Sequence, residues 1–357
     1  MASPSEPTVL HVLPHPGGGA ETYIDLLEGL EGYRHRRVAL SPTRSRARGL
    51  VAALARRPRI VRAAGDADLV HVHGDMAAMI AAPAMRGRPL VITTHGLHRL
   101  RRSRGLSAWL VRRRLGAAVA ASSRTICIAE DEREDLGSVL PRSLRGRLVV
   151  VPNGVAVPAL PDAEARARAR RSLGLGEREV GVLFVWQLER RKDPLGAIAA
   201  VEAVRTRGAD VVLLIAGAGP LEAEVGARES AAVRVLGHRE DLDDLYAAAD
   251  LFLLPSHREG MSFALLEAMA HGLAPVVANG PGNSETVGAA GAVFPAGDLS
   301  AMADRVAELA ADPGARGDLG TAARERVRTE LSLERFLVGT REQYEAALRE
   351  GGAAQGA

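Results

Sequence analysis

Short apolar runs alternate with longer amphipathic stretches along the whole chain. Six runs lie in each half, each four to eight residues long and rich in Val, Leu and Ile. Runs of this length, separated by helical patterns, are typical of parallel strands covered by helices on both faces. The sequence therefore predicts an α/β protein with two doubly wound parallel sheets. The predicted strands cover residues 8–14, 36–40, 68–74, 89–96, 124–129 and 147–154 in the first half, and 180–186, 210–217, 233–237, 250–255, 274–278 and 292–295 in the second.

Two series of strands indicate two domains, and a chain of 357 residues is long enough for both. Pro and Gly interrupt the pattern in VPNGVAVPALPDAEARARA, at residues 151–169, where a new helix also starts. We therefore expect one Rossmann-like domain over residues 1–155 and a second over residues 156–330. The last residues, GGAAQGA, predict a disordered tail over residues 351–357.

Charge is divided unevenly between the two halves. Residues 1–155 carry 24 arginines against 13 acidic residues, a net of +11, and the remainder carries 22 basic and 30 acidic residues, a net of −8. Halves of opposite sign favour different binding partners. The single cysteine, Cys127, lies in the apolar run TICIA, which predicts a buried thiol in a reducing cytoplasm. We expect no secretory signal in MASPSEPT, and no apolar run approaches the about 18 residues of a membrane-spanning helix.

Ligands of doubly wound sheets bind beyond the carboxyl ends of the strands, so polar residues there are the candidates for chemistry. Gly17, Gly18 and Gly19 follow the first predicted strand. Because glycine has no side chain, backbone amides at this point can approach a phosphate or a sugar. A plain turn is the alternative.

Three histidines lie near the ends of the third and fourth predicted strands. His95 ends the fourth strand, where a hydrogen-bonded structural histidine is the alternative to a catalytic one. His71 and His73 alternate within the third strand, so their side chains point the same way. No Cys or carboxylate cluster in the sequence completes a metal site around them. We therefore expect no metal.

The most informative pattern is LFLLPSHREGMSFALLEAMAHGLAPVVA, at residues 251–278. A predicted strand ends at Pro255, and Ser262 is a natural N-cap for the apolar helix that follows. The first amides of that helix, together with its dipole, favour an anion. Glu259 precedes the helix and Glu267 lies about one turn inside it, so both carboxylates can accept hydrogen bonds from hydroxyls beside the anion. One capping and one solvated glutamate are the alternative.

The E-x7-E pattern that follows a PS-x-x-EG loop resembles the signature of glycosyltransferase family 4, whose members are retaining nucleotide-sugar glycosyltransferases with the GT-B fold. Further motifs occur in the family's order: GGGAE, HVHG, TTHG, VVPNGV, RKDP, LLIAGAGP, LGHRED and GPGNSE. The resemblance therefore covers residues 8–345. It implies two Rossmann-like domains facing across a cleft, the first on the acceptor side and the second binding the nucleotide sugar. It also implies a final helix, over residues 331–350, that returns to the first domain.

The same resemblance implies a role for each candidate residue. Glu259 should contact hydroxyls of the donor sugar, Glu267 the ribose of the nucleotide, and His95 the donor sugar near the reacting bond. Other residues hold the diphosphate or lie near the nucleobase. They are Gly18, Gly19, Met261, Ser262 and Phe263 for the diphosphate, and His238 and Arg239 for the base, and Gly260 is a further donor-binding residue.

Lys192 is the only lysine in a chain with 45 arginines. In the family, an arginine and a lysine after the first strand of the second domain contact the donor diphosphate; Lys192 takes the lysine position and Gln187 the arginine position. A compact ammonium can stabilise the charge that grows on the leaving nucleotide. Trp186 stands where the family has a glycine, and Ala129 where a serine is usual. A catalytically impaired relative that binds nucleotide sugars is therefore the alternative interpretation.

The expected reaction moves a sugar from a nucleotide-sugar donor to an acceptor hydroxyl, with retention of anomeric configuration and without a metal or other cofactor. His95, Lys192 and Glu259 are the expected catalytic residues, and the acceptor is a small molecule, a glycan or a lipid-linked glycan. Nucleic-acid binding is not expected, because the basic half lacks interleaved aromatics and a reading motif. Seven arginines from Arg99 to Arg114, with apolar residues among them, suggest a surface for an anionic membrane, with a solvated helix as the alternative. We expect a cytoplasmic protein with this candidate peripheral contact.

Overall fold

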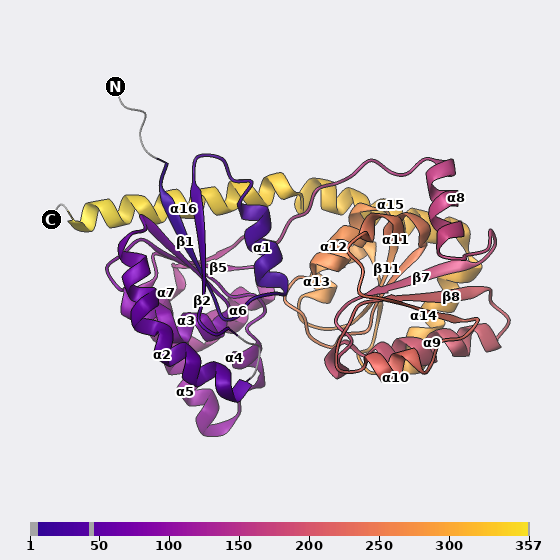
Figure 1. The fold of residues 1–357 in the computed structure, drawn as a ribbon, viewed down its shortest axis with the longest axis horizontal. Helices are drawn as coiled ribbons and strands as arrows, with labels where there is room; N and C mark the ends of the chain where they lie inside the picture. Colours follow the sequence, from indigo (N-terminus) through magenta and orange to yellow (C-terminus); the bar gives the residue numbers. More distant parts are fainter. Residues whose placement is uncertain (1–5, 43–45, 356–357) are drawn as a thin grey trace. The chain divides into compact units, whose positions relative to one another are not determined.

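The structure, a computed structural model, describes residues 6–42 and 46–355. The chain divides into two compact units (Figure 1). Unit 1 comprises residues 1–153 together with 334–357, and unit 2 comprises residues 154–333. Each unit contains one six-stranded parallel sheet, and all twelve predicted strands are present. The predicted α/β fold with two doubly wound parallel sheets is therefore confirmed.

The sheet of unit 1 has the strand order β2-β1-β3-β4-β5-β6. Its strands are β1 (Thr8–Leu13), β2 (Arg34–Ala39), β3 (Leu69–His73), β4 (Leu90–Thr93), β5 (Arg124–Cys127) and β6 (Leu148–Val150). Its helices are α1 (Gly19–Leu27), α2 (Arg46–Gly65), α3 (Asp75–Ala81), α4 (His98–Arg102), α5 (Gly105–Ala121), α6 (Glu130–Val139), α7 (Arg142–Arg145) and α16 (Leu333–Gln355), with a 3₁₀ helix η1 (Ala82–Met85).

The two faces of the unit 1 sheet differ in chemistry. One face is apolar and packs against α2, α3 and α5 through residues such as Leu10, Val12 and Val72. The opposite face carries histidines, because residues that alternate along a strand point to opposite sides. His11 pairs in register with His71 of the neighbouring strand, so the two side chains share this face. The alternation of side chains along each strand therefore places the histidines on one face of the sheet and the apolar core on the other.

The sheet of unit 2 has the strand order β12-β11-β10-β7-β8-β9. Its strands are β7 (Val180–Val185), β8 (Val211–Ala216), β9 (Val233–Gly237), β10 (Leu251–Leu254), β11 (Ala274–Ala278) and β12 (Ala292–Phe294). Its helices are α8 (Ala163–Ser172), α9 (Pro194–Thr206), α10 (Glu222–Gly226), α11 (Leu242–Ala248), α12 (Phe263–Ala270), α13 (Asn283–Val287), α14 (Leu299–Ala311) and α15 (Pro313–Glu330), with 3₁₀ helices η2 (Arg190–Lys192) and η3 (Gly288–Ala290).

One face of the unit 2 sheet forms a large aliphatic cluster with α9 and α14. Val182, Phe184 and Leu213 are fully buried in it, and Ile198 of α9 packs against them. Burial of a side chain of this size contributes about 1.5–3 kcal/mol relative to exposure. This core fixes β7 and β10 as neighbours in the middle of the sheet.

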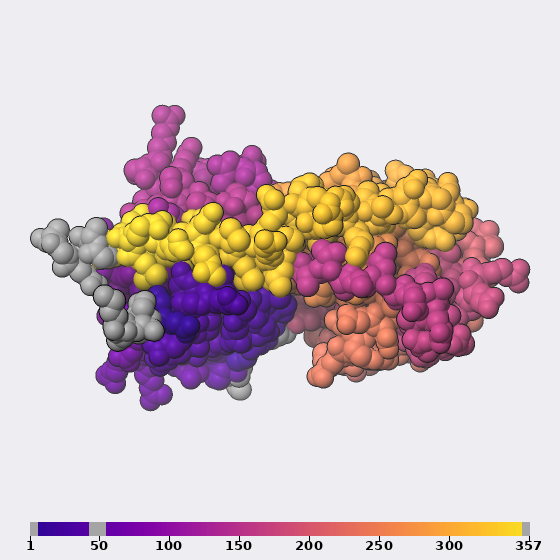
Figure 2. Space-filling view, turned by 90° about the horizontal axis from the view of Figure 1, so that it is seen from above, coloured from indigo at the N-terminus to yellow at the C-terminus, as the bar shows by residue number. Residues whose placement is uncertain are grey.

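The last helix, α16, belongs to unit 1 from Glu334 onward, and Figure 2 shows it on the surface of that unit. Phe336 and Tyr344 anchor it, since both side chains are buried. The helix runs to Gln355, so residues 351–355 are helical, where composition predicted disorder. The Ala and Gln in this stretch are compatible with a helix that is already anchored upstream. Residues 356–357 of the predicted tail lie outside the described residues.

None of the helices in the described ranges combines the length and the hydropathy that a bilayer-spanning segment requires.

Backbone contact between two loops requires a glycine at position 217. Gly217 has φ 147°, and a Cβ atom there would meet the Trp186 carbonyl oxygen at 1.8 Å. The loops after β7 and β8 can therefore lie side by side, with the Trp186 amide donating to the Ala216 carbonyl at 3.0 Å. The glycine in the AGAGP motif thus places the loop that leads to Lys192.

We predict that Gly217→Ala lowers the free energy of unfolding by about 3 kcal/mol, since it adds a steric clash to a strained φ. Gly208→Ala is the matched control: Gly208 also has positive φ, +92°, but a Cβ atom there would have no other atom within 4 Å. We expect this control to lose only about 1 kcal/mol. Urea denaturation measures the free energy of unfolding of both variants. Equal losses would show that the contact between the two loops contributes nothing to stability.

Candidate active site

Two neighbouring strands of unit 2 bring the central polar residues together. The loop after β7 carries Lys192, and the loop after β10 carries Glu259. Because β7 and β10 are adjacent and parallel, their carboxyl ends meet at the same edge of the sheet. Lys192 Nζ donates a hydrogen bond to Glu259 Oε1 at 2.6 Å.

The Lys192–Glu259 pair is almost completely buried. The two side chains are 4% and 8% exposed, respectively. Burial lowers the pKa of Lys192 to about 7, and the charge of Arg191 adds to this, while Glu259 opposes it. Desolvation of the ammonium therefore outweighs its attraction to the carboxylate. An additional anion beside Lys192 would favour the protonated form.

Further polar groups hold Glu259 in this position. Ser256 Oγ donates a hydrogen bond to Glu259 Oε1. Arg191, which is 38% exposed, approaches the same oxygen at 3.4 Å. The amide of Asn283 donates to the Ser256 carbonyl at 2.8 Å and so ties this loop to the one after β11. The two loops can approach closely because Gly282 of the GPGN motif has no side chain. A Cβ atom at Gly282 would meet the Gly260 carbonyl oxygen at 1.6 Å.

The Trp186 indole lies directly beneath Lys192. Lys192 Nζ is 3.6 Å from the centroid of the ring, a cation–π geometry. The indole is partly buried and packs against the aliphatic cluster of unit 2, and its Nε1 is buried without a hydrogen-bond partner among the described residues. Gln187, the next residue, is exposed.

The N-terminus of α12 lies in the same loop region. Ser262 caps the helix, as expected from the sequence, and its Oγ accepts a hydrogen bond from the Leu265 amide at 3.2 Å. Gly260, Met261 and Ser262 are buried. The first amides of a helix have no acceptor within the helix, so this terminus is suited to an anion.

Glu267 lies further along α12 and is held by a residue that the sequence did not identify. Tyr246 donates a hydrogen bond to Glu267 Oε2 at 2.8 Å. Burial raises the pKa of Glu267; the Tyr246 hydrogen bond opposes this, and the Asp243 charge adds to it. His238 and Arg239 follow β9, and Arg239 forms an ion pair with Asp241.

The remaining candidates belong to unit 1. Gly18 has φ 85° and is the N-cap of α1, with Gly19 as the first helical residue. His95 follows β4 with φ 51°, a left-handed conformation that is rare for a non-glycine residue. His95 Nε2 lies 3.0 Å from Nδ1 of His73. Burial lowers the pKa of His95 to about 3, and His98 adds to the effect.

His95 is thus connected to a histidine cluster that the sequence indicated only in part. The ring nitrogens of His11, His71 and His73 lie within 4.8 Å of one another. Their six ring nitrogens all have hydrogen-bond partners in the structure, so the cluster is fully bonded without an ion. The sequence showed that His71 and His73 point the same way. The signal for His11 was its alternation with Leu10 and Val12 in β1, but the register of β1 with β3 was needed to place it beside His71.

Comparison with known proteins gives the family. Residues 6–159 match the description Glycosyltransferase Family 4, and residues 179–312 match Glycosyl transferases group 1. The chain is 32% identical over 320 residues to a D-inositol 3-phosphate glycosyltransferase of Salinispora arenicola, covering 80% of this chain and 70% of the relative. It is 33% identical over 180 residues to a GDP-mannose-dependent alpha-(1-6)-phosphatidylinositol monomannoside mannosyltransferase of Mycolicibacterium smegmatis, covering 46% of this chain and 47% of that relative.

Solved structures agree on the fold. Anabaena Alr3699/HepE in complex with UDP superposes with a TM-score of 0.77 at 18% identity, covering 95% of this chain and 100% of that one. The lipopolysaccharide glycosyltransferase WaaG gives a TM-score of 0.68 at 17% identity, covering 98% and 100%. The fold is that of the two-domain GT-B glycosyltransferases. The chain belongs to glycosyltransferase family 4, and it is a glycosyltransferase.

The buried histidines predict a loss of stability in acid. Burial holds the pKa of His11, His71 and His73 well below 6.5, so the unfolded chain binds more protons than the folded one as pH falls below that value. As the pH falls from 7 to 5, the free energy of unfolding should therefore decrease by about 2 kcal/mol for each of these histidines. Glu132 acts in the opposite direction over the same range, because burial raises its pKa to about 7.

The variant His71→Gln isolates the histidine contribution. Urea denaturation at pH 7 and pH 5 should show a pH-dependent loss that is smaller by about 2 kcal/mol in His71→Gln than in the parent protein. Identical losses in the two proteins would mean that His71 does not resist protonation in the folded state.

Proposed function

We propose that the protein transfers a sugar from a nucleotide-sugar donor to an acceptor hydroxyl, with retention of anomeric configuration and without a metal ion. The observation that carries this proposal is the buried Lys192–Glu259 pair next to the N-terminus of α12. A cation and the first amides of a helix can bind a diphosphate, and a carboxylate beside them can bind the hydroxyls of the attached sugar. The complexes of HepE with UDP and with UDP-glucose support a donor of this class.

Lys192 and the α12 N-terminus serve the leaving group. Negative charge grows on the donor diphosphate as its bond to the sugar breaks. Lys192 becomes fully protonated beside that charge, and the amides of Met261, Ser262 and Phe263 add the positive end of a helix dipole. These groups supply the stabilisation that a divalent cation gives in other transferases, which supports metal independence. Gly18 and Gly19, at the start of α1 in unit 1, can offer backbone amides to a phosphate.

The carboxylates bind hydroxyl groups of the donor. Glu259 accepts from hydroxyls of the sugar, and Lys192 and Ser256 hold the carboxylate in position. Glu267 accepts from the ribose and is oriented by Tyr246. Burial raises the pKa of Glu267, so hydrogen bonds donated by the ribose hydroxyls would stabilise its charged form. Gln187 supplies a neutral contact to the diphosphate, and the base lies near His238 and Arg239.

We assign a front-side displacement to the reaction, following the family. The bond between the anomeric carbon and the phosphate oxygen breaks, and the acceptor oxygen bonds to the same face of the sugar. The proton of the acceptor hydroxyl passes to the departing phosphate oxygen. For His95, which belongs to unit 1, we keep as a proposal the role near the reacting bond that the family resemblance implies. The experiment that tests the proposal is a screen of UDP-, GDP-, ADP- and TDP-sugars, with NMR of the product: an inverted anomeric configuration, or no transfer from any donor, would contradict it.

Variants at the ion pair test the roles of its two members. We expect Lys192→Ala and Glu259→Gln each to reduce kcat/KM by about 100-fold or more, because each removes a charged contact from a dry site. Arg191→Ala is the control; its side chain is partly exposed and contacts Glu259 only at 3.4 Å, so its loss should cost less than about threefold. Steady-state kinetics on the folded variants decides, and values within twofold of the parent for both ion-pair variants would refute the assignment.

Trp186 tests the alternative of a catalytically impaired relative. Because the indole packs on the core and supports Lys192, we expect Trp186→Gly to weaken binding of the donor's nucleoside diphosphate by about 1 kcal/mol, or roughly fivefold in Kd. Trp186→Phe keeps an aromatic face and should bind within twofold of the parent. Calorimetry measures both. Tighter binding by Trp186→Gly would show that the indole obstructs the site and would favour the alternative.

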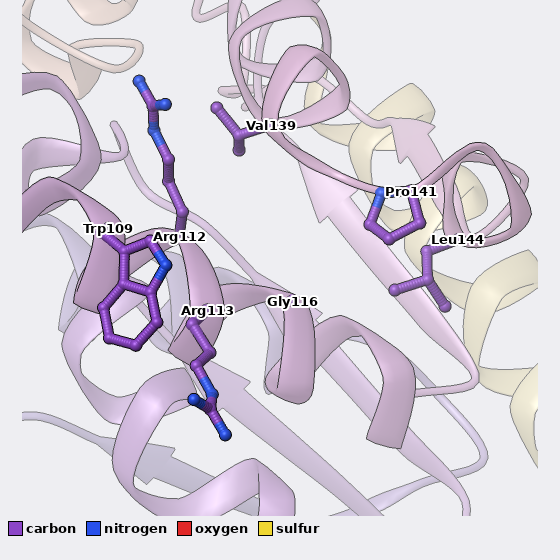
Figure 3. Close-up of a pocket in the computed structure, with 7 residues that line it drawn as sticks. All are labelled: Trp109, Arg112, Arg113, Gly116, Val139, Pro141 and Leu144. Carbon is purple, nitrogen blue, oxygen red and sulfur yellow. The ribbon is translucent and has the colours of Figure 1, made fainter.

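We also propose a peripheral contact between α5 and an anionic membrane. Leu106, Trp109 and Leu110 are 81%, 55% and 49% exposed. Arg112 and Arg113 flank them, and Figure 3 shows both arginines and Trp109 on one side of a groove whose other side is formed by α6, α7 and their connection. Exposed apolar side chains beside cations match the interface of an anionic bilayer. Not every residue of the predicted basic segment takes part, since Leu97 is buried and Arg101 is paired with Asp131 and Asp135.

The membrane proposal predicts co-sedimentation with phosphatidylglycerol vesicles at low salt. The double variant Leu106→Ser, Trp109→Ser should lose at least about tenfold in affinity, since it removes most of the exposed apolar area. Leu160→Ser is the control, because Leu160 is as exposed as Trp109, at 55%, but belongs to unit 2. The proposal is refuted if the parent protein stays in the supernatant. It is also refuted if the Leu106→Ser, Trp109→Ser double variant and the Leu160→Ser control lose the same amount of vesicle binding.

We place the enzyme in the cytoplasm, where nucleotide sugars are made and thiols stay reduced. Cys127 fits a reducing compartment, since its thiol is buried and unpaired with another cysteine.

A further inference from the structure

Glu132 is a fully buried carboxyl group that the proposed reaction does not use. It lies in the first turn of α6, and its side chain is 0% exposed. Its Oε2 is hydrogen-bonded to the Thr94 hydroxyl and accepts from the Ile128 amide at 3.1 Å. Its Oε1 is buried without a hydrogen-bond partner among the described residues. An unpaired oxygen on a fully buried acid requires an explanation.

Thr94 connects Glu132 to the segment TTHG, residues 93–96, which we call the TTHG loop. Thr94 follows β4 directly, and the three residues after it, His95, Gly96 and Leu97, have φ values of 51°, 106° and 47°. Positive φ is unfavourable for a non-glycine residue, so contacts at both ends must hold this backbone in place. The buried Leu97 side chain supplies one contact, and Thr94 supplies the other.

The Thr94 hydroxyl has two neighbouring oxygens but only one proton. Its Oγ1 is bonded to Glu132 Oε2 and also lies 3.3 Å from the Ile126 carbonyl oxygen. An ionised Glu132 can only accept, so Thr94 then donates to it and the bond to Ile126 is lost. A Glu132 protonated on Oε2 donates to Thr94, and Thr94 donates to Ile126. The protonated acid therefore makes both bonds at once, while Oε2 still accepts from the Ile128 amide.

The groups around Glu132 also favour the protonated form. In the described part of the chain no cation is bonded to Glu132: Arg101 of α4 acts on it only through its charge, and its guanidinium is bonded to Asp131 and Asp135 at 3.0 and 2.6 Å. Burial raises the pKa of Glu132 to about 7; the bonds that its oxygen accepts and the Arg101 charge oppose this, and the Asp131 charge adds to it. On β5, burial raises the pKa of the Cys127 thiol, which stays neutral.

A helix cap is the plainer interpretation of Glu132. The N-cap residue of α6 is Ala129, whose side chain cannot cap the helix. A glutamate three positions further on can reach back to a free amide, and the bond from Ile128 fits that role. The cap does not account for Thr94, which lies 38 residues away in the sequence and belongs to a different loop.

We propose that Glu132 is a positioning residue for the TTHG loop, and that it acts as a neutral acid that donates a hydrogen bond to Thr94. Ionisation of Glu132 turns the Thr94 hydroxyl away from Ile126 and leaves a charge out of contact with solvent. The start of the loop then loses a constraint, so the loop responds to pH. All of these groups belong to unit 1.

The pH range of this response follows from the titration of Glu132. Its pKa is about 7 in the folded protein, against 4.5 for an ordinary glutamate. Because the folded pKa is the higher one, the stabilisation by this proton is fully present below pH 4.5 and is lost as the pH rises through 7. The loop should therefore be held below about pH 7 and released above it.

Infrared spectroscopy of the full-length protein without ligand measures the protonation of Glu132. At pH 6 the parent should show the C=O stretch of a protonated acid, and this band should disappear with a midpoint within about one unit of pH 7. Glu132→Gln should lack the band, since glutamine keeps the size of the side chain and a donor for Thr94 but cannot ionise. Glu267, whose pKa burial also raises, is present in both proteins and cancels in the difference spectrum.

Backbone NMR measures whether the loop follows this titration. The amide resonances of His95, Gly96 and Leu97 should move with the same midpoint as the infrared band in the parent. In Glu132→Gln they should not move over this range. Thermal unfolding confirms that the variant is folded.

Thr94 and Thr93 provide a matched pair of variants. Both side chains are buried, and replacement by valine removes only the hydroxyl. The Thr93 hydroxyl is bonded to His71 at 2.7 Å and lies 3.3 Å from the Tyr23 hydroxyl, so it takes no part in the contact with Glu132. Thr94→Val should shift the acid band, because the acid O–H loses its acceptor. Thr93→Val should leave the band where it is in the parent.

Kinetics extends the test to sugar transfer, and this arm alone rests on the proposed function. The suitable quantity is kcat at saturating donor, because a bound diphosphate keeps Lys192 protonated and kcat reports groups of the complex. Between pH 6 and pH 8.5, kcat of the parent should fall by about fivefold or more through this group, and kcat of Glu132→Gln should change by less than about twofold. The donor KM should be the same in both proteins within about twofold.

Three results would overturn the inference: no difference between the parent and Glu132→Gln in the infrared spectrum at pH 6, loop amides that titrate equally in both proteins, or equal band shifts in Thr93→Val and Thr94→Val. The spectroscopic arms require no turnover, so they separate the two proposals. A parent protein that transfers no sugar but shows the acid band and the loop titration refutes the proposed function and leaves the role of Glu132 standing. Active protein without the band does the reverse.

Discussion

The buried ion pair between Lys192 and Glu259 is the interaction on which the site in unit 2 depends. Each charge is removed from water only because the other is 2.6 Å away, and even so the pKa of Lys192 falls to about 7. The pair joins the loops after two adjacent strands, and the glycines of the neighbouring motifs let other loops approach it. A diphosphate beside the ammonium would replace the solvation that burial removes, so the pair is suited to an anion.

The sequence predicted the fold well because the physical signals were local. Apolar runs of strand length, separated by amphipathic helices, located all twelve strands, and Ser262 was recognised as a helix cap from its position alone. The contact between Lys192 and Glu259 required the strand order, since 67 residues separate them. The rule that ligands bind at the carboxyl ends of strands identified the loops but not which of them are neighbours.

Residues that support the site from other elements could not be found from sequence motifs. Tyr246 reaches Glu267 from α11, and Ser256 bonds Glu259 within a loop whose conformation no pattern specifies. The histidine face shows the same limit. The alternation of His71 and His73 was visible, but the bonds from His73 to His11 of β1 and from His11 to His35 of β2 depend on register between strands far apart in the sequence. The orientation of the Trp186 indole likewise depends on packing in the core.

The most direct test of the account is calorimetry of nucleoside diphosphate binding at pH 8 in buffers of different ionisation enthalpy. Because the pKa of Lys192 is about 7 in the free protein and an adjacent diphosphate raises it, binding should take up about one proton. Lys192→Arg remains charged at pH 8 and should bind with no proton uptake. Binding heats that do not depend on the buffer in the parent protein, or equal uptake in Lys192→Arg, would contradict the account.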